Sequence, residues 1–251
     1  MPRKPAPSRD GFNAHWRARF VRYALLHDDD AGVAGWSATG LRARFRFFAG
    51  RWSPPRAGGR WLDVGCGAGT YTRHLSAAGQ EAVGVDYSVP SLRKARARDP
   101  GHATWVAGDA RALPFPGGTA DGVLCFGVTQ ALGESGPVVR ELVRLLDRDG
   151  ELWIDGLNAW CLPHLWERLR RRLRRQPPHL HYESPRRLQR LVRDAGMAEV
   201  RLLWLPILPG RLQRWQGWLE HPAVVRLLHG VPGLGALVSH SVVVVATGRT
   251  P

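Results

Sequence analysis

The stretch RWLDVGCGAGTYTRHL, residues 60–75, joins a short apolar run to a glycine-rich turn and then to a helical pattern. Three glycines alternate with small residues in the turn: Gly65, Gly67 and Gly69. Asp63 stands two places before the first of them. Glycine lets a backbone turn tightly and approach a ligand closely. The stretch therefore predicts a ligand-binding loop between a first strand and a first helix.

The spacing of these glycines distinguishes the loop from two common phosphate-binding loops. A dinucleotide fingerprint places its third glycine three residues after the second, whereas the third glycine here follows the second by two residues. A Walker loop is followed by Gly-Lys-Ser or Gly-Lys-Thr, and neither sequence follows here. We therefore expect a ligand that is not held through a pyrophosphate.

Strand and helix patterns alternate along the chain from residue 60 onward. Five apolar runs of strand length occur before residue 157: RWLDVG, EAVGVD, ATWVAGD, DGVLCFG and ELWIDG. Helical spacings separate most of these runs, and the turn DRDG precedes the last of them. A sixth run, AEVRLLWL, and a closing run, SHSVVVVATG, follow towards the C-terminus. This alternation predicts an α/β fold with a mostly parallel, doubly wound sheet covered on both faces.

Composition and charge place few limits on the function. Hydrophobic residues make up 44% of the 251 residues, which fits a globular protein with a substantial core. The formal net charge of +15 favours an acidic partner such as nucleic acid. However, all of the 36 Lys and Arg residues except Lys4 and Lys94 are arginine, a skew that is also typical of codon bias. Charge alone therefore does not predict a nucleic-acid partner, although such a partner stays an alternative.

The cysteines favour a reducing environment. Cys66, Cys125 and Cys161 are far apart, and no Cys or His cluster has the spacing of a metal site. Cys66 and Cys125 lie in apolar strand contexts, where cysteine is usually a small core residue. The N-terminal MPRKPAPSRDGF lacks the apolar stretch of a secretory signal. We therefore expect no metal and a cytoplasmic setting.

The glycine loop and its neighbours resemble a known family. LDVGCGAGTYTRHL resembles motif I of class I S-adenosylmethionine-dependent methyltransferases, in the form found in the small-molecule, type 11-like branch. Three further segments follow in the order of that family: VGVDYS, GDARALPFPGGTADGVLCFGV and RELVRLLDRDGELWIDG. The resemblance covers residues 60–156 strongly and 184–248 more loosely. It implies a Rossmann-like α/β fold, a seven-stranded sheet with an antiparallel last strand, and S-adenosylmethionine as cofactor.

The resemblance also implies how the chain is divided. Residues 1–59 correspond to a helical N-terminal lid, and residues 60–251 correspond to the Rossmann-like methyltransferase domain. Helical insertions are expected at about 157–183 and 206–236. In this family the lid and the insertion after the fifth strand cover the cofactor and carry the specificity for the acceptor.

The cofactor contacts are implied in the same way. Asp86, which ends the second strand, is expected to accept hydrogen bonds from both ribose hydroxyls. Asp63 offers negative charge near the ammonium group, and Asp109 with the backbone of Ala110 meets the adenine amino edge. The expected cofactor-binding residues are Asp63, Gly65, Cys66, Gly67, Gly69, Asp86, Tyr87, Asp109, Ala110 and Phe126. For the two aromatic residues, contact with the adenine ring and a place in the ordinary core are equal alternatives.

The acceptor is indicated mainly by motifs that are missing. The fourth-strand end FGVTQAL lacks the Asn/Asp-Pro-Pro-aromatic signature of amino-methylating enzymes, and no Pro-Cys dipeptide supplies the nucleophile of cytosine C5 enzymes. Where many small-molecule relatives have a histidine, this chain has Ala131. The catalytic residue is therefore unassigned, and the candidates in the insertion after the fifth strand are His164, His179, His181 and Tyr182.

These observations predict methyl transfer by in-line displacement to a small or lipid-linked molecule, at oxygen. Arginine and tryptophan interleave in WERLRRRLRRQ and RLQRWQGWLEHPAVVRLL, which suits an anionic membrane surface or a solvated helix face. Peripheral contact with the inner membrane face is thus an alternative to a purely cytoplasmic location. Arg42 and Arg44 are expected either to reach the cofactor carboxylate or to face solvent. An RNA-modifying methyltransferase and a non-catalytic cofactor-binding relative are the alternative functions.

Overall fold

A seven-stranded sheet organises the chain. The structure is a computed structural model that describes residues 9–54, 56–99, 101–208, 210–231 and 233–250. The strand order is β3-β2-β1-β4-β5-β7-β6. The strands are β1 Arg60–Val64, β2 Glu81–Asp86, β3 Thr104–Ala107, β4 Ala120–Cys125, β5 Leu146–Leu157, β6 Met197–Leu205 and β7 Ser241–Arg249. The first five strands pair in parallel, and β7 runs antiparallel to both of its neighbours. The expected Rossmann-like sheet with an antiparallel last strand is therefore confirmed.

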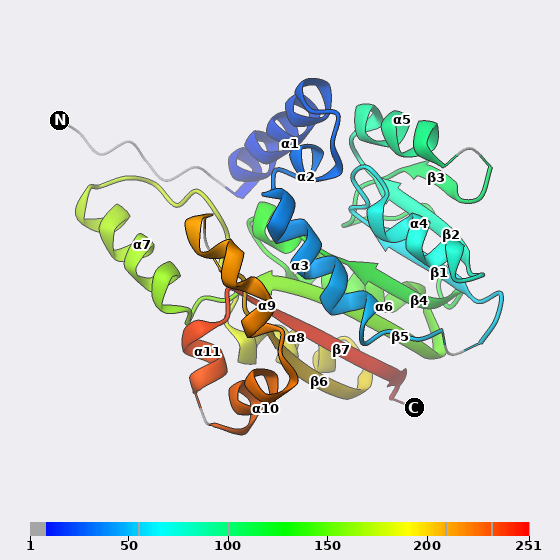
Figure 1. Ribbon diagram of the computed structural model, residues 1–251. Helices are drawn as coiled ribbons and strands as arrows, with labels where there is room; N and C mark the ends of the chain where they lie inside the picture. The colour runs from blue at the N-terminus through cyan, green and yellow to red at the C-terminus, as the bar shows by residue number, and fades with distance from the viewer. Residues whose placement is uncertain (1–8, 55, 100, 209, 232, 251) are drawn as a thin grey trace.

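Helices cover both faces of the sheet (Figure 1). On one face, α6 Gly136–Leu145 and α8 Pro185–Asp194 pack their apolar side chains against the sheet. On the other face, α3 Ala38–Ala49 and α4 Thr70–Ala77 contribute large aromatic residues to a second cluster. Because the strands are buried on both faces, they consist of nearly continuous apolar residues rather than an alternating pattern. The run of valines in β7 shows this most clearly, since all four are at most 1% exposed.

Three helices precede the sheet; the first two lie beyond the ends of its strands, and the third lies across one face (Figure 1). They are α1 Arg9–Leu26, α2 Asp30–Val33 and the helix α3 already described. α2 begins at the N-cap Asp29, and α3 begins at the N-cap Ser37, whose side chain accepts a hydrogen bond from the amide of Gly40. α5 Val89–Arg98 follows β2 and begins at the N-cap Ser88. These caps satisfy amide groups that have no partner within the helix.

One local expectation was wrong. The sequence DRDG was expected to form a turn before the fifth strand, but β5 already begins at Leu146 and includes these residues. Leu146 pairs with Ala120, and the register then shifts between Ala120 and Gly122. The extra residues are therefore absorbed as an irregularity within the strand pair, as in a bulge.

Two helical segments follow the fifth and the sixth strand of the chain. α7 Leu162–Leu173 follows β5, and a group of short helices follows β6. That group consists of η2 Gly210–Trp215, α9 Gln216–Leu219, α10 Pro222–Gly230 and α11 Leu234–Val238. The 3-10 turn η1 Thr129–Ala131 follows β4. Within the described part of the chain, no helix has the length and apolar character needed to cross a membrane.

Candidate functional site

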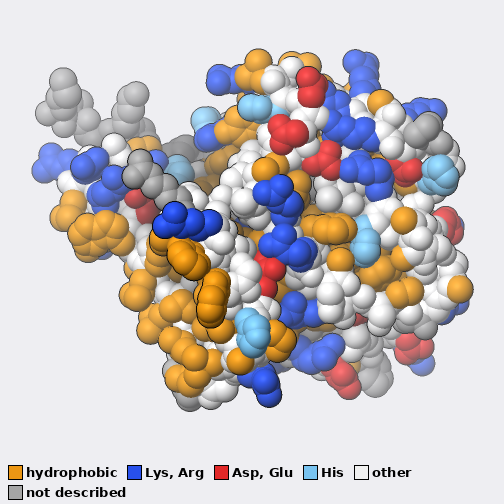
Figure 2. Space-filling view, in the orientation of Figure 1, with side chains coloured by type: hydrophobic (Ala, Val, Ile, Leu, Met, Phe, Trp, Pro, Cys, Tyr) orange, Lys and Arg blue, Asp and Glu red, His pale blue; other side chains and the backbone are white. Residues whose placement is uncertain are grey.

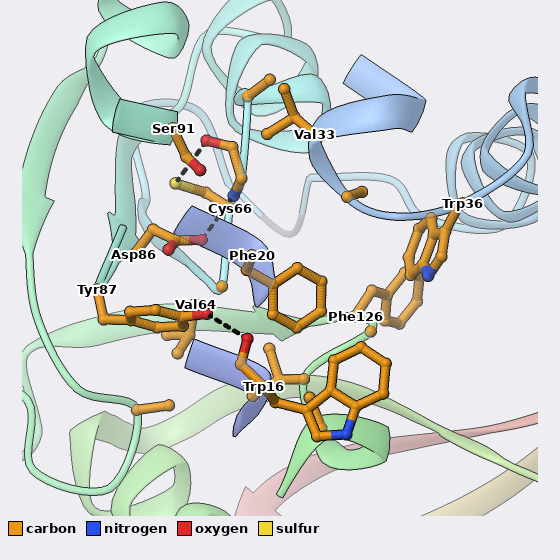
Figure 3. Close-up of a pocket in the computed structure, with 18 of the residues that line it drawn as sticks. Trp16, Phe20, Val33, Trp36, Val64, Cys66, Asp86, Tyr87, Ser91 and Phe126 are labelled. Atoms are coloured by element: carbon orange, nitrogen blue, oxygen red, sulfur yellow. Dashed lines mark hydrogen bonds between the residues drawn. The ribbon is translucent and has the colours of Figure 1, made fainter. Parts of the chain in front are cut away.

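A cavity lies at the carboxyl ends of the strands, beneath the N-terminal helices (Figure 3). One side, here called the strand wall, is formed by the loops after β1, β2, β3 and β4, and it includes Gly65, Gly67, Asp86, Asp109 and Phe126. The other side, here called the lid wall, is formed by α1, α2, α3 and the segment between the last two. It includes Asn13, Trp16, Arg17, Phe20, Asp30 and Trp36. The carboxyl ends of parallel strands are the usual ligand-binding edge of an open α/β sheet.

The glycine loop has the conformation that its sequence predicts. Gly65, Gly67 and Gly69 have φ angles of +79°, +53° and +84°, a region that residues with a side chain rarely adopt. A Cβ atom on Gly65 would lie 2.2 Å from Cγ2 of Val128, and one on Gly69 would lie 2.4 Å from the Trp105 ring. A Cβ atom on Gly67 would meet nothing within 4 Å. The first and third glycines thus allow close packing, while the second lies against open space in the cavity.

Asp86 fixes the shape of this loop from the end of β2. Its Oδ2 accepts a hydrogen bond of 2.9 Å from the amide of Gly67, and its Oδ1 accepts one of 2.8 Å from the amide of Ser88. Burial raises the pKa of Asp86, while these amide hydrogen bonds act in the opposite direction. The carboxylate lines the cavity beside the loop (Figure 3). A diol placed here would meet a preoriented acceptor, and the expected contact with the ribose hydroxyls stays a prediction.

Asp63 lies behind the loop and does not line the cavity. Its Oδ2 accepts hydrogen bonds from the amide and the hydroxyl of Thr72, at 3.0 and 2.6 Å, in the first turns of α4. Complete burial raises the pKa of Asp63 to about 7, against the lowering effect of the Thr72 hydrogen bonds. Its expected role near the ammonium group stays a prediction, and the observed contacts give it a role in joining β1 to α4.

Asp109 lines the cavity together with Ala110, but its carboxylate is already bound by two arginines. Arg111 donates to Oδ2 at 2.7 Å, and Arg17 of α1 reaches the same oxygen. Partial burial would raise the pKa of Asp109, but the hydrogen bonds from Arg111 and the charge of Arg17 lower it to about 2. Asp109 therefore joins the strand wall to the lid wall and stays ionised.

Tyr87 and Phe126 both line the cavity, on its strand wall. The Tyr87 hydroxyl lies 3.5 Å from the carbonyl oxygen of Trp16 and 3.4 Å from that of Arg17, so it meets the backbone of α1 (Figure 3). Phe126 is 5% exposed and packs edge-on against the Phe48 and Tyr71 rings. Both positions allow ring contact with a ligand. Cys66 lines the cavity as well, and burial raises the pKa of its thiol well above the usual range.

The lid wall supplies cavity residues that the sequence analysis did not identify. Trp16 and Phe20 lie one helical turn apart on α1, with ring centroids 5.3 Å apart, and Trp36 follows α2. Figure 3 shows these rings around the apolar part of the cavity. A spacing of aromatic residues at 16, 20 and 23 was visible in the sequence as one face of a helix. That pattern indicated burial, but it did not indicate a ligand.

The four candidate bases lie outside the cavity, around the start of α7. Nδ1 of His164 lies 2.8 Å from the carbonyl oxygen of Asn158, and its Nε2 lies 3.0 Å from Nδ1 of His240. His181 lies 2.8 Å from the Glu183 carboxylate, and the Tyr182 ring packs against the rings of both His164 and His179. None of these four candidates is among the described residues that line the cavity. Their catalytic role stays a prediction.

Arg44 differs from both alternatives considered for it. It is 3% exposed and pairs with Asp155 at 3.4 Å, while its Nη2 donates to Oγ of Ser241 at 3.0 Å. The guanidinium also lies 4.3 Å from the centre of the Trp36 ring. Asp155 in turn accepts a hydrogen bond of 2.7 Å from the amide of Gly127. Arg44 is therefore neither solvated nor placed in the cavity, but links α3 to the sheet. Arg42 is exposed.

Comparison with known proteins identifies the domain. Residues 62–154 match the family model described as a methyltransferase domain. Residues 62–154 therefore form a methyltransferase domain of the S-adenosylmethionine-dependent type. The match begins in β1, contains the glycine loop and Asp86, and ends in β5, so it covers the strand wall. The methyltransferase domain therefore contains the half of the cavity that the sequence motifs had indicated.

Two curated relatives resemble the methyltransferase domain at similar levels. A malonyl-[acyl-carrier protein] O-methyltransferase from Pseudescherichia vulneris is 30% identical over 159 residues, which are 62% of this chain and 60% of the relative. A demethylmenaquinone methyltransferase from Corynebacterium kroppenstedtii is 33% identical over 110 residues, which are 43% and 46% of the two chains. The chain spans about half the length of these relatives.

A solved structure shows the same fold over most of the chain. It is a chain of the complex between the Haloferax volcanii Trm112 methyltransferase activator and a methyltransferase, with a TM-score of 0.62 and 19% identity. The match covers 92% of this chain and 97% of that chain. At this identity, the similarity concerns the fold of the methyltransferase domain.

Proposed function

We propose that this chain transfers a methyl group from S-adenosylmethionine to an oxygen atom of a small or lipid-linked acceptor, by in-line displacement. One observation carries the proposal: the family's cofactor loop and an apolar, ring-lined lid wall face each other across a single cavity. The cofactor supplies an electrophilic methyl group on a sulfonium when it is bound. The residues of the chain position the reactants, and positioning alone contributes up to roughly 7–11 kcal/mol to such a reaction.

The hydrogen-bonding groups of the strand wall suit those of the cofactor. The open space in front of Gly67 leaves room for a ligand against the loop. Asp86 would receive the ribose hydroxyls, and the backbone of Ala110 with Asp109 would meet the adenine edge. Tyr71 adds a buried hydroxyl beside the cavity that has no hydrogen-bond partner within the described residues. A ligand with both polar and aromatic parts suits these groups.

The lid wall favours an acceptor with an apolar or flat body. Trp16, Phe20 and Trp36 present rings on the lid wall, and Val128 and Leu132, which follow β4 on the strand wall, add aliphatic groups. The names of the curated relatives describe enzymes that act on an acyl-carrier-linked acid and on a quinone precursor. Each name describes a small acceptor group, which is attached to a carrier protein in one case and is part of a quinone precursor in the other. By analogy, the acceptor of this chain would be of this class.

The titratable groups at the cavity indicate which oxygen is methylated. Among the described lining residues there is no histidine, and the ionisable groups are Arg17, Asp30, Cys66, Tyr71, Asp86, Tyr87 and Asp109. The carboxylates at 86 and 109 are held by amides or arginines. An oxygen that ionises by itself near neutral pH, such as a carboxylate or an acidic phenol or enol, needs no protein base. We propose an acceptor oxygen of that kind.

Calorimetry with S-adenosylhomocysteine, followed by a transfer assay, tests this proposal. We expect binding to the wild-type protein and a loss of affinity of at least tenfold for Asp86→Asn, because the amide replaces one acceptor oxygen with a donor. Thermal unfolding of the same variant checks that the loop stays folded. The transfer assay then compares a hydrophobic carboxylic acid, a phenol and an RNA, with labelled S-adenosylmethionine. Absence of binding by the wild-type protein, or methylation of RNA alone, contradicts the proposal.

A further inference from the structure

Exposed apolar side chains are concentrated on one side of the molecule. In the described part of the chain, every strongly exposed large hydrophobic residue lies between residues 162 and 238, except Leu25, Leu26 and Val89. They come from α7, η2, α9, α10 and α11, and we call this surface the apolar plateau. Figure 2 shows hydrophobic side chains gathered over these helices, with Lys and Arg side chains along their border. An apolar surface of this breadth on a protein indicates an interaction site.

Helix α7 presents the clearest part of the plateau. Its exposed apolar residues are Leu162, Leu165, Trp166, Leu169 and Leu173. Their spacing of three or four residues places them on one face of the helix. Trp166 is 67% exposed and Leu173 is 74% exposed, whereas His164 on another face is buried against the protein. The apolar face of α7 therefore points away from the core, opposite to the usual arrangement of an amphipathic surface helix.

Positive charge accompanies this apolar face. Residues 162–176 contain six arginines and one glutamate. The glutamate, Glu167, pairs with Arg170 and Arg171. Arg168, Arg172, Arg174 and Arg175 are exposed beside the apolar residues. Leucine and tryptophan on one face, flanked by arginine, is the pattern of helices that lie in the interface of a membrane with anionic lipids.

The second segment extends the plateau with the same residue types. Trp218 is 70% exposed, Leu227 is 52% exposed and Trp215 is 48% exposed, and Arg214 and Arg226 are exposed near them in the sequence. Tryptophan is enriched at membrane–water interfaces, where an apolar ring meets a polar layer. Two separate insertions thus present one kind of surface.

Hydrogen bonds join the two insertions at their bases. Nδ2 of Asn158, just before α7, donates to the carbonyl oxygens of Ala236 and Ser239, at 2.7 and 2.9 Å. The His164–His240 contact lies beside them. Since β5 and β6 both run antiparallel to β7, they point in the same direction. The two insertions therefore emerge at the carboxyl edge of the sheet, where the cavity also lies.

The second insertion also contacts the lid. Gln213 of η2 bonds with Thr39 and Ser37 at the start of α3, and Glu220 pairs with Arg46 at 2.8 Å. The plateau is thus connected through α3 to the lid wall of the cavity. A surface bound to the plateau would lie at the same edge as the mouth through which an acceptor must enter.

We infer that the apolar plateau binds the surface of a bilayer that contains anionic lipid. The inference rests on the proposed function, because a lipid-linked acceptor would then reach the cavity from that bilayer. The arginines beside the apolar residues favour this occupant, because leucine and tryptophan flanked by arginine suit a helix that lies in the interface of an anionic bilayer. The apolar side chains would enter the headgroup layer, and the arginines would meet the lipid phosphates.

Flotation with phosphatidylcholine vesicles, with and without phosphatidylglycerol, tests this inference. We expect the wild-type protein to float only with the anionic vesicles, and the floated fraction to fall as salt rises. The double variant Trp166→Ser, Leu169→Ser should bind at least tenfold more weakly, because it removes two apolar side chains that the bilayer would bury. The matched control is Leu25→Ser, Leu26→Ser, which removes exposed leucines outside the plateau and should float as the wild-type protein does.

A charge variant separates the electrostatic part of the binding. Arg172→Ala, Arg174→Ala should weaken flotation by about fivefold for each arginine removed. The control Arg190→Ala, Arg193→Ala removes exposed arginines from α8 and should have no effect. Equal loss in both variants would mean that net charge, not the plateau, causes binding, and would overturn the inference.

Two further measurements distinguish the possible failures. Calorimetry with S-adenosylhomocysteine reports the proposed function independently, and the plateau variants should bind it with unchanged affinity. Size-exclusion chromatography with light scattering reports self-association. A wild-type protein that binds the cofactor but does not float overturns the plateau inference and leaves the proposed function standing. A dimer that Trp166→Ser, Leu169→Ser converts to a monomer, without flotation of either, would assign the plateau to a second copy of the chain.

Discussion

The two walls of the cavity are held together in different ways. In the strand wall, the amides of Gly65 and Cys66 donate to the carbonyl oxygen of Val85 at 2.7 and 3.0 Å, and Asp86 binds the amide of Gly67. These partners lie about twenty residues apart, on neighbouring strands. In the lid wall, helices are attached by long side chains whose partners are far away: Arg17–Asp109 is separated by 92 residues and Arg44–Asp155 by 111.

The two kinds of wall suit the two substrates of the proposed reaction, the cofactor and the acceptor. A wall built from backbone hydrogen bonds and glycines has little freedom to change, which suits a cofactor common to a family. A wall that meets the sheet through side chains, by ion pairs and by the apolar packing of α3, can change the residues that face the cavity, which suits an acceptor that differs between relatives. Loops and covering segments carry specificity in many folds for this reason. Three substitutions test the comparison, in order of decreasing effect.

The largest effect is expected for Arg44→Met, which removes the buried ion pair between α3 and the sheet. Asp155 would be left as an unpaired carboxylate that is 2% exposed, and breaking such a pair typically costs about 3–5 kcal/mol. Urea denaturation measures the free energy of unfolding. The control is Arg46→Met on the same helix, whose partner Glu220 is on the surface, and it should lose about 1 kcal/mol or less. Similar losses in both variants would show that the buried pair does not fasten the lid.

A smaller loss is expected for Gly69→Ala in the strand wall. The φ angle of +84° costs an alanine about 1–2 kcal/mol, and the new Cβ would overlap the Trp105 ring, which adds about 1–3 kcal/mol. Gly79→Ala is the matched control. Gly79 has a φ angle of +79° but open space around its Cβ position, so only the backbone cost applies. Equal thermal destabilisation of the two variants would mean that the Trp105 side chain moves to make room for the new Cβ. The strand wall would then be less rigid than we infer.

The smallest effect, at most about 1.4 kcal/mol for each pH unit, is expected in the pH dependence of stability. Burial raises the pKa of Asp63 to about 7, from an ordinary value of 3.8. The folded protein therefore holds the proton more tightly than the unfolded chain does. The stability that the folded protein gains from this tighter proton binding is complete below about pH 4. It is lost as the pH rises through about 7, by at most about 1.4 kcal/mol per pH unit.

The variant Asp63→Asn removes this titration and keeps an acceptor for Thr72. Its free energy of unfolding should fall less than that of the wild-type protein between pH 5 and pH 7.5, as measured by urea denaturation. Asp149→Asn, at an exposed position, should leave the wild-type pH dependence unchanged. A parallel decline for wild type and Asp63→Asn would place the titrating group elsewhere, with Asp86 and Asp155 as the other buried aspartates whose pKa is raised by burial.

Much of the strand wall was predictable because its signals are local. The positive φ angles at Gly65, Gly67 and Gly69 follow from a tight turn between a strand and a helix, and glycine is the residue that allows them. The acidic end of β2 could be located because the apolar run of the strand stops at an aspartate, Asp86. The DRDG segment was misplaced because whether such residues turn or pair depends on the neighbouring strand, and here Leu146 pairs with Ala120.

The lid wall could not be predicted in the same way. Nothing near Arg17 in the sequence indicates that it reaches Asp109, and nothing near Arg44 indicates that it is buried against Asp155. The four candidate bases were selected because they lie in the expected insertion, yet none of them is among the described residues that line the cavity. His164, for example, contacts Asn158 and His240 instead. Position within an insertion does not determine which way a side chain faces.

The sequence by itself determined the sheet, the glycine loop and the type of methyl donor, because these depend on short-range periodicity and on residues with special backbone properties. Only the tertiary structure decided which helices close the cavity, which arginines are buried, and that the exposed apolar residues of two insertions face the same side. Those features depend on contacts between segments roughly a hundred residues apart, and such contacts are set by the packing of the whole chain rather than by any local pattern.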